Sequence, residues 1–235
     1  MKIALIGYGK MGKAIEQVAL ERGHEVCAKF GSGGIDEAEL KQADVAIEFS
    51  RPEAAFDNLQ TCINLGVPVV CGTTGWLSQY DILCKHCLAL EGSFLYASNF
   101  SIGVNIFFAV NRYLAAMMNN QPQYEVEIEE IHHTQKIDAP SGTAITLAND
   151  IISNLSRKTA WTKGEAGKDF EIPIFSIRED PAPGTHLVSY ISEIDTIDIV
   201  HTAHSRTGFA TGAVVAAEWL QGKKGVFSMK DMLGF

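Results

Sequence analysis

The chain opens with Lys2-Ile-Ala-Leu-Ile6-Gly7-Tyr8-Gly9-Lys10-Met11-Gly12, an apolar strand followed by a G-x-G-x-x-G turn. Residues 13–22 have the spacing of a helix, and residues 25–30 that of a second strand. Glycines at these positions allow a tight turn, close approach of the backbone to a pyrophosphate, and packing of the helix on the strand. The segment therefore predicts a dinucleotide-binding Rossmann unit whose cofactor contacts include Gly7, Tyr8, Gly9, Lys10, Met11 and Gly12.

Three further apolar segments, residues 44–49, 67–71 and 94–97, continue the pattern of a parallel sheet. The second and third end in short polar loops. Ligands bind beyond the carboxyl ends of the strands in an open α/β sheet. Either loop alone would be no more than a polar turn, but together with the glycine turn they trace one rim. We expect this rim to contact the nicotinamide half of the cofactor through Gly72, Thr73, Thr74, Ser98, Asn99 and Phe100.

The choice between NADH and NADPH depends on the residues just after the second strand. An acidic residue about 20 positions beyond the fingerprint usually accepts hydrogen bonds from the adenosine ribose, and it repels a 2′-phosphate. Here no carboxylate appears after that strand before Asp36, whereas Lys29, Ser32 and Lys10 are available to a phosphate. Lys29 could equally be a solvated strand residue. The sequence favours NADPH, with Ser32 as a cofactor contact.

After Ser101 the pattern changes to a helix over residues 105–118 and to strands over residues 124–131, 172–177, 186–192 and 195–202. Residues 153–169 are polar and predict a loop, and a helix over residues 212–220 would pack back onto the first domain. The predicted fold class is α/β. It combines a Rossmann-type parallel sheet, residues 1–101 and 207–235, which binds the dinucleotide, with an α+β domain, residues 102–206, which has a mixed, largely open sheet and binds the substrate.

A second informative stretch is Glu130-Ile-His132-His133-Thr-Gln-Lys136-Ile-Asp138-Ala-Pro140-Ser141-Gly142-Thr143. It joins a strand to a helix, and the N-terminus of a helix favours an anion. Two imidazoles, one fixed cation and an anion-binding helix end are typical of an acid-catalysed site for a carboxylate. His132, His133, Lys136, Ser141, Gly142 and Thr143 are therefore candidates for the catalytic and substrate-binding residues of such a site.

Two other interpretations of these histidines stay open. His132 and His133 could simply end the strand, and at most one of them would face the site while the strand continues. Glu130, His132 and His133 could also be metal ligands, and Glu130 and His132 have the i, i+2 spacing that suits a strand. No third ligand is evident at a suitable spacing, so we predict no metal.

Composition bounds the remaining possibilities. A net charge of −9 argues against a nucleic-acid or anionic membrane surface. No signal peptide or membrane-spanning apolar run is apparent, and five cysteines without framework spacing are typical of reduced thiols. We therefore expect a cytoplasmic protein. Cys84-Lys-His-Cys87 is a solitary C-x-x-C within an expected helix, where packing thiols are a better interpretation than redox or zinc use.

The segment HHTQKIDAPSGTA, residues 132–144, is similar to the signature of the 4-hydroxy-tetrahydrodipicolinate reductase (dihydrodipicolinate reductase) family. The resemblance extends to GYGKMG, GTTG, SNFS and the segment His201-Thr-Ala-His-Ser-Arg206-Thr-Gly-Phe209-Ala-Thr-Gly-Ala213. Two departures are a short connection over residues 31–43 and Ala-Pro-Gly-Thr-His186 where relatives usually have a Gly-Glu-His turn.

The resemblance implies reduction of a cyclic dicarboxylate with hydride from NADPH or NADH, both accepted, in the diaminopimelate route to lysine. It implies that His132 donates the proton, that Lys136 is a second donor and charge stabiliser, and that His133 binds a substrate carboxylate. It also implies a homotetramer assembled through the sheet of the second domain. Arg206 is a further candidate cation. An imidazole suits proton transfer because its pKa lies near neutral pH.

Two other function classes remain at this point. Another Rossmann-type amino-acid dehydrogenase would explain the glycine turn but not the segment 132–144. A non-catalytic dinucleotide-binding redox sensor would have no use for His132, Lys136 and an anion-binding helix end together, and it would need an output module.

Overall fold

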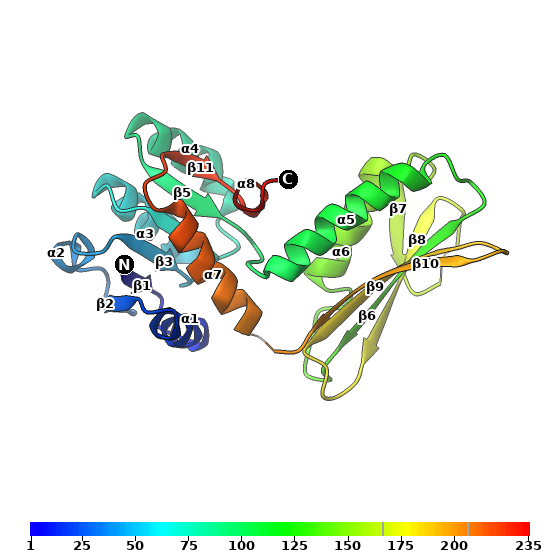
Figure 1. Ribbon diagram of the computed structural model, residues 1–235, viewed down its shortest axis with the longest axis horizontal. Helices are drawn as coiled ribbons and strands as arrows, with labels where there is room; N and C mark the ends of the chain where they lie inside the picture. The colour runs from blue at the N-terminus through cyan, green and yellow to red at the C-terminus, as the bar shows by residue number, and fades with distance from the viewer. Residues whose placement is uncertain (166, 206) are drawn as a thin grey trace. The chain divides into compact units, whose positions relative to one another are not determined.

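The N-terminal glycine turn belongs to a six-stranded sheet in which every strand pair is parallel, in the order β11-β5-β4-β3-β1-β2 (Figure 1). The order reverses at β1, as in Rossmann-type folds, which confirms the predicted fold class. The computed structural model describes residues 1–165, 167–205 and 207–235. The six strands are β1 (Lys2–Ile6), β2 (Glu25–Phe30), β3 (Val45–Glu48), β4 (Val69–Cys71), β5 (Ser93–Tyr96) and β11 (Gly225–Phe227).

Helices cover both faces of this sheet. Alternate residues of a strand point to opposite faces, so Ile3 and Leu5 join one core with α1 and α7, while Ala4 and Ile6 join another with α3 and α4. Both strand faces are apolar, as expected for a buried parallel sheet. The helices are α1 (Lys10–Glu21), α2 (Glu37–Leu40), α3 (Pro52–Asn64), α4 (Tyr80–Ala89), α7 (Thr207–Leu220) and α8 (Met229–Leu233), with a 3₁₀ turn η1 (Leu77–Gln79).

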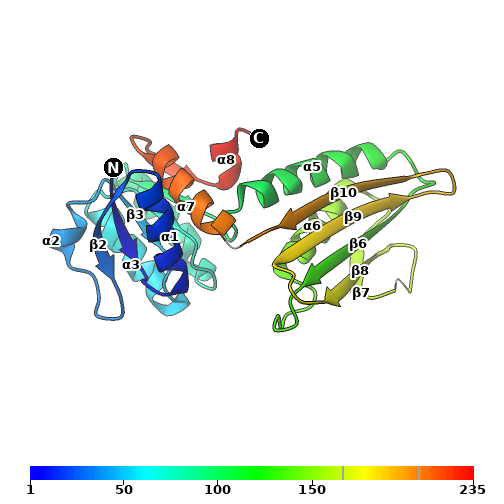
Figure 2. The ribbon, with the colours of Figure 1, turned by 60° about the horizontal axis from the view of Figure 1, so that its bottom comes forward.

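The second sheet has five strands in the order β10-β9-β6-β8-β7, as Figure 2 shows. The β10–β9 and β9–β6 pairs are antiparallel, and the β6–β8 and β8–β7 pairs are parallel, so the sheet is mixed as predicted. The helices α5 (Ile102–Met118) and α6 (Gly142–Asn154) share one apolar core with it. The strands are β6 (Glu125–His132), β7 (Ala160–Lys163), β8 (Glu171–Arg178), β9 (Gly184–Ile191) and β10 (Thr196–Ala203).

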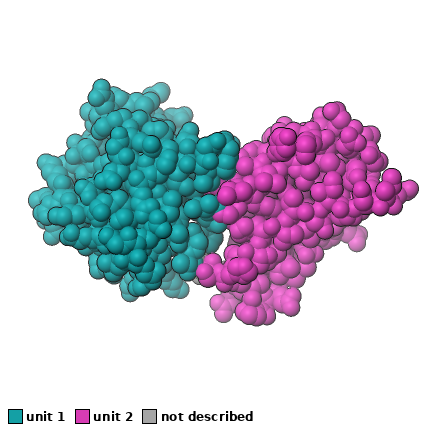
Figure 3. All heavy atoms as spheres, in the orientation of Figure 1, with its two compact units in different colours: residues 1–102, 207–235 teal, residues 103–206 magenta. Residues whose placement is uncertain are grey.

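The two sheets belong to separate compact units (Figure 3). Unit 1 combines Met1–Ile102 with Thr207–Phe235, and unit 2 spans residues 103–206. Each unit has its own hydrophobic core. Within the described residues, none of the helices is both long and apolar enough to cross a membrane.

Several elements differ from the sequence-based expectation. The segment 153–169 was expected to be a loop, but it contains β7, which pairs with β8. The short elements α2, β11 and α8 were not predicted. The strand β11 has only three residues, so its identity depends on pairing with β5, which no local pattern reveals.

A close approach fixes the position of α7. A Cβ added at Gly212 would lie 1.7 Å from the carbonyl oxygen of Phe100 in the loop after β5. A side chain at this position would therefore push the helix away from the loop that follows the fifth strand. By contrast, the nearest atom to a Cβ at Gly208, near the start of the same helix, is Ser101 Oγ at 3.9 Å.

We predict opposite effects for alanine at these two glycines. Gly212→Ala should lower the stability of unit 1 by about 1–3 kcal/mol or more, because the backbone of Phe100 or the helix must shift. Gly208→Ala is the matched control and should be neutral or stabilising, because alanine is the better helix former. Thermal unfolding of both variants measures this. An equal or higher Tm for Gly212→Ala would contradict the close contact.

Candidate active site

The glycine turn between β1 and α1 has the geometry of a phosphate-binding turn. Gly7 has φ +93°, and a Cβ there would lie 2.1 Å from the carbonyl oxygen of Phe49. A Cβ at Gly12 would lie 2.3 Å from the carbonyl oxygen of Gly7, whereas a Cβ at Gly9 meets no described atom within 4 Å. Gly7 and Gly12 thus serve close packing, and Gly9 leaves the N-terminus of α1 open. Lys10, Met11 and Gly12 form the first turn of this helix, and that turn contains no acidic residue.

A cavity of about 410 Å³ lies beside this turn, within unit 1. It contains Gly7, Tyr8, Gly9 and Ser32, four of the predicted cofactor contacts, and it adds Arg51, an exposed cation that the sequence analysis did not single out. The complete lining is Ile6, Gly7, Tyr8, Gly9, Gly31, Ser32, Gly34, Ile35, Phe49, Ser50, Arg51, Ala54 and Asn58.

The expectation that Lys29 is available to a phosphate is wrong in this structure. Its ammonium forms an ion pair with Glu16, and the hydroxyl of Tyr8 donates to the same carboxylate. The pKa of Lys29 is raised, chiefly by the hydrogen bond to Glu16. Asp36 accepts hydrogen bonds from the amides of Ala38 and Glu39 as the N-cap of α2, so this carboxylate is already used.

The loops after β4 and β5 lie at the carboxyl ends of their strands. The Oγ1 of Thr73 accepts a hydrogen bond from the amide of Ser50 at 2.8 Å, which ties the ends of β3 and β4 together. The ring of Phe100 is buried, with its centroid 5.6 Å from that of Phe49. Six predicted contacts lie in these loops and not in the lining of the cavity: Gly72, Thr73, Thr74, Ser98, Asn99 and Phe100.

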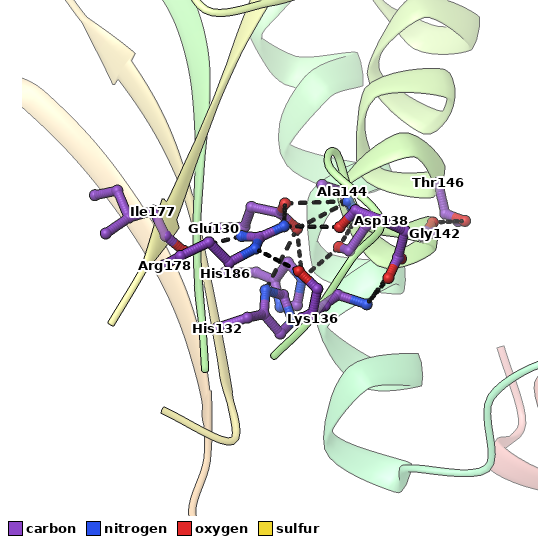
Figure 4. A network of polar contacts seen from close by, with 11 residues as sticks. Glu130, His132, Lys136, Asp138, Gly142, Ala144, Thr146, Ile177, Arg178 and His186 are labelled. Atoms are coloured by element: carbon purple, nitrogen blue, oxygen red, sulfur yellow. Dashed lines mark hydrogen bonds and ion pairs between the residues drawn. The ribbon is translucent and has the colours of Figure 1, made fainter. Parts of the chain in front are cut away.

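In unit 2 the functional side chains gather at the end of β6 (Figure 4). Glu130 and His132 continue the buried face of this strand, after Val126 and Ile128, and His132 is its last residue. Glu130 has no exposed surface. Its Oε2 lies 3.6 Å from Nδ1 of His132 and 3.8 Å from Nε2 of His186, which is its register partner on β9.

The N-terminus of α6 is fixed to the same carboxylate. The amide of Ser141, the N-cap, donates to both oxygens of Glu130 at 3.1 and 3.0 Å. The Oγ of Ser141 accepts from the amide of Ala144 and lies 3.1 Å from Nε2 of His186, to which its proton is available. Gly142 and Thr143 carry the first two amides of the helix, which have no carbonyl partner inside it.

The loop from β6 to α6 carries Lys136, whose Nζ lies 2.7 and 2.8 Å from the carboxylate oxygens of Asp138. Arg178, the register partner of His132 on β8, donates to the carbonyls of Lys136 and Asp138 and to Oε1 of Glu130. His133 follows the strand, and its amide donates to the carbonyl of Ala182. The structure therefore brings His132 and Ser141 to one buried carboxylate, and Arg178 links the loop of Lys136 to the same carboxylate.

These contacts set the charges of the site. Burial raises the pKa of Glu130, but hydrogen bonds from Ser141 and Arg178 outweigh it and hold that pKa below its usual value. Burial lowers the pKa of His132, to which Lys136 and Arg178 add, while Glu130 opposes them. Burial lowers the pKa of His186 to about 3. At neutral pH the site therefore holds a charged Glu130 beside two neutral imidazoles.

Three side chains lie close enough together to bind a metal ion, but the positive charges around them disfavour one. Among the described residues, Glu130, His132 and His186 offer ligand atoms that all lie within 4.8 Å of one another. The third residue of this set is His186, whereas the sequence analysis had considered His133. The guanidinium of Arg178 already donates to Glu130, and Lys136 acts on His132 as a neighbouring positive charge. Two fixed cations disfavour a third, and we assign no metal to these residues.

Sequence reasoning missed two residues of this network, His186 and Arg178. Both reach Glu130 through strand pairing with β9 and β8, and residues this distant in sequence give no local signal. Arg206 lies outside the described residues. Cys84 is half-buried and Cys87 is buried within α4, and both thiols are free, in agreement with a packing role.

Comparison with known proteins follows the same division of the chain. Residues 1–100 match the model of the dihydrodipicolinate reductase N-terminus, and residues 103–233 match that of the C-terminus. A 4-hydroxy-tetrahydrodipicolinate reductase of Christiangramia forsetii is 52% identical over 99% of this chain and 98% of its own. The protein of that name from Neisseria meningitidis serogroup C is 35% identical over 93% and 84%.

Solved structures agree on the fold. A dipicolinate-bound dihydrodipicolinate reductase from Paenisporosarcina sp. TG-14 superposes with a TM-score of 0.81 at 21% identity, covering 99% of both chains. An amine dehydrogenase from Mycobacterium smegmatis reaches 0.60 at 11% identity, covering 96% of this chain and 94% of its own.

The parallel sheet with its glycine turn and the mixed second sheet define a two-unit protein of the Rossmann class. Within that class, the chain belongs to the dihydrodipicolinate reductase family.

The buried imidazole of His186 predicts a pH dependence of stability. Its pKa is about 3 in the folded protein and about 6.5 in the unfolded chain, so between these values only the unfolded chain binds the proton. The free energy of unfolding should therefore fall as pH falls below about 6.5. His186→Gln should lose less stability than the wild type between about pH 7.5 and about pH 4.5, measured by urea unfolding.

The control is His86→Gln, which deletes an imidazole of α4 in unit 1, where Nε2 contacts Asn64. If His186→Gln kept the full pH slope of the wild type, His186 would not be held neutral.

Proposed function

We propose that this protein reduces 4-hydroxy-tetrahydrodipicolinate to tetrahydrodipicolinate with NADPH or NADH, in lysine biosynthesis via diaminopimelate. The observation that carries the proposal is the cluster around Glu130, which brings a buried imidazole, a lysine and the open end of a helix together in a chain of this family. A nicotinamide supplies the hydride when bound. The protein must then hold a dicarboxylate and deliver a proton, and the ring hydroxyl leaves as water.

The two units divide this work. Unit 1 would hold the dinucleotide, since its glycine turn, its open α1 N-terminus and its cavity lie together. Unit 2 would hold the substrate and form the contacts between subunits. The alternative of an amino-acid dehydrogenase or a redox sensor has less support, because the relatives at 52% and 35% identity carry the name of this one reductase.

Carboxylate binding falls to the N-terminus of α6. The amides of Gly142 and Thr143 point out of the helix end, and its dipole favours an anion. Ser141 holds this end in place as the N-cap. Lys136 and His133 would add charge-assisted hydrogen bonds. In the structure Lys136 is paired with Asp138, so a substrate carboxylate would compete with that side chain.

Proton delivery falls to His132, with Lys136 as second donor. The imidazole is neutral in the free protein because burial lowers its pKa. A dicarboxylate bound nearby adds negative charge, which raises the pKa of a neighbouring imidazole. Substrate binding and protonation of His132 would therefore be coupled, and the proton would be in place before the ring accepts hydride.

The decisive experiment is turnover. The substrate is generated in the assay by a coupled synthase, and the loss of reduced-nicotinamide absorbance is measured with each cofactor. Turnover with this product and none with amino acids would support the reductase. Cofactor binding without turnover of any of these compounds would exclude both enzymes and favour the non-catalytic redox sensor.

For His132→Gln we predict a fall in kcat of about 10²–10⁴-fold, the usual contribution of a positioned acid, with a much smaller change in KM. The proton moves only in the transition state, so ground-state binding should survive. Steady-state kinetics at neutral pH measures both constants, and His86→Gln in unit 1 is the control. Nearly full kcat in His132→Gln would mean that His132 only packs the end of β6.

Cofactor choice would depend on the cavity in unit 1. Among the residues that the structure describes, no carboxylate lines this cavity, whereas Arg51 and Ser32 do. A 2′-phosphate would therefore meet a cation and a hydroxyl, with Lys10 in the first turn of α1 as a further cation. We propose that both nicotinamides are used and that NADPH is preferred.

We predict a higher kcat/KM for NADPH than for NADH at low salt, with the difference shrinking as salt screens the phosphate. Arg51→Gln should reduce the preference by about tenfold, the size of one charge-assisted contact. Lys29→Gln is the matched control and should change it less, because Lys29 is paired with Glu16. Equal efficiency with NADH in the wild type would show that the missing carboxylate does not govern the choice.

Assembly as a homotetramer would use the second sheet. Among the described residues, α5 and α6 share the core on one face of this sheet. The opposite face carries Phe175, Ile177 and Val200, and the last two are 38% and 57% exposed. Apolar strand faces of this kind are typical of subunit interfaces.

A further inference from the structure

Arg178 makes more contacts than a surface ion pair would. Its Nη2 donates to Oε1 of Glu130 at 3.2 Å and to the carbonyl of Asp138 at 2.7 Å. Its Nε donates to the carbonyl of Lys136 at 3.3 Å, and its Nη1 to the carbonyl of Ile177 at 2.9 Å. Each guanidinium nitrogen therefore has an acceptor inside the protein, so Arg178 is not placed to bind the substrate directly.

The loop that Arg178 holds has little else to fix it. The side chain of Ile137, in the middle of the loop, is 97% exposed, so apolar packing does not anchor this segment. At its start, Thr134 contacts Asp180 through its amide and its hydroxyl. Between Thr134 and the N-cap Ser141, the carbonyls of Lys136 and Asp138 are held by Arg178. Segments that bury little apolar surface take their position from such polar contacts.

The guanidinium of Arg178 also binds Glu130, whose position is fixed by other contacts. Glu130 is completely buried, and it is bound to the amide of Ser141 at the N-terminus of α6. Arg178 is also the register partner of His132, two residues along β6 from Glu130. One side chain therefore connects the loop of Lys136 to the strand of His132.

We propose that Arg178 is a positioning residue: it holds the carbonyls of Lys136 and Asp138 against the buried carboxylate of Glu130, and so fixes Lys136 relative to His132. The proposal rests on the roles of Lys136 and His132 in the proposed function. A guanidinium suits this task because it presents its donors in a rigid planar fork, which an ammonium cannot replace.

The first test is Arg178→Lys, which keeps the charge and loses the fork. We expect kcat/KM for the dicarboxylate to fall by about 10²-fold, the usual cost of a displacement of about 1 Å at a reacting group. KM for the nicotinamide should not change. The matched control is Arg157→Lys, in which the guanidinium also donates to two backbone carbonyls of unit 2, those of Met118 and Tyr124. This control should keep nearly full activity.

A double-mutant cycle separates positioning from a general loss of structure. If Arg178 acts through Lys136, then Arg178→Lys in a Lys136→Met background should cost no more than about twofold, since the group it positions is gone. The full loss in both backgrounds would overturn the proposal, as would unchanged activity of Arg178→Lys. The cycle is measured on kcat/KM and on Kd for pyridine-2,6-dicarboxylate.

The two measurements distinguish the failure of this proposal from that of the proposed function. Absence of turnover in the wild type would reject the proposed reaction, while the Kd cycle would still decide whether Arg178 and Lys136 act together in binding a dicarboxylate. Non-additive effects on Kd support the positioning role, and additive effects reject it.

Discussion

A carboxylate without any exposed surface lies at the end of β6, and the shape of the second unit's site depends on it. Burying an unpaired charge costs several kcal/mol, so Glu130 must be surrounded by donors. Those donors are the amide of Ser141 at the N-terminus of α6 and the guanidinium of Arg178 on β8, and the imidazoles of His132 and His186 lie 3.6 and 3.8 Å from the carboxylate. The contacts that stabilise this one buried charge therefore bring together the N-terminus of α6, the loop of Lys136 and the two histidines.

The same carboxylate bears on the proposed role of His132 as a proton donor. Burial and two nearby cations lower the pKa of His132, and Glu130 is the group that opposes them. For His186, burial outweighs the opposing charge of Glu130 and lowers the pKa to about 3. Two histidines with ring centroids 5.0 Å apart therefore have different pKa values and would have different roles in the proposed function. His132 would take up a proton when an anion binds, and His186 would stay neutral beside Ser141.

In the first unit, close backbone contacts fix the positions of the loops and helices around the cavity. Gly7 and Gly12 pack against carbonyl oxygens, and Gly212 lets α7 approach the loop after β5. The hydrogen bond between Ser50 and Thr73 then ties the ends of β3 and β4 beside the cavity. These contacts build a rigid rim at the carboxyl ends of the strands, where a Rossmann-type sheet binds its ligand.

The sequence by itself determined the features that local chemistry controls. The glycine turn indicated the parallel sheet, because its spacing is needed for turn, approach and packing at once. The run from His132 to Thr143 indicated a strand, a loop and a helix end, because caps and periodicity involve residues only a few positions apart. Only the tertiary structure decided which distant residues meet: β11 beside β5, His186 opposite Glu130, Arg178 opposite His132, and Lys29 paired with Glu16 and not free for a phosphate. These pairings join residues far apart in the chain, so no pattern within a short segment reveals which strands and side chains meet.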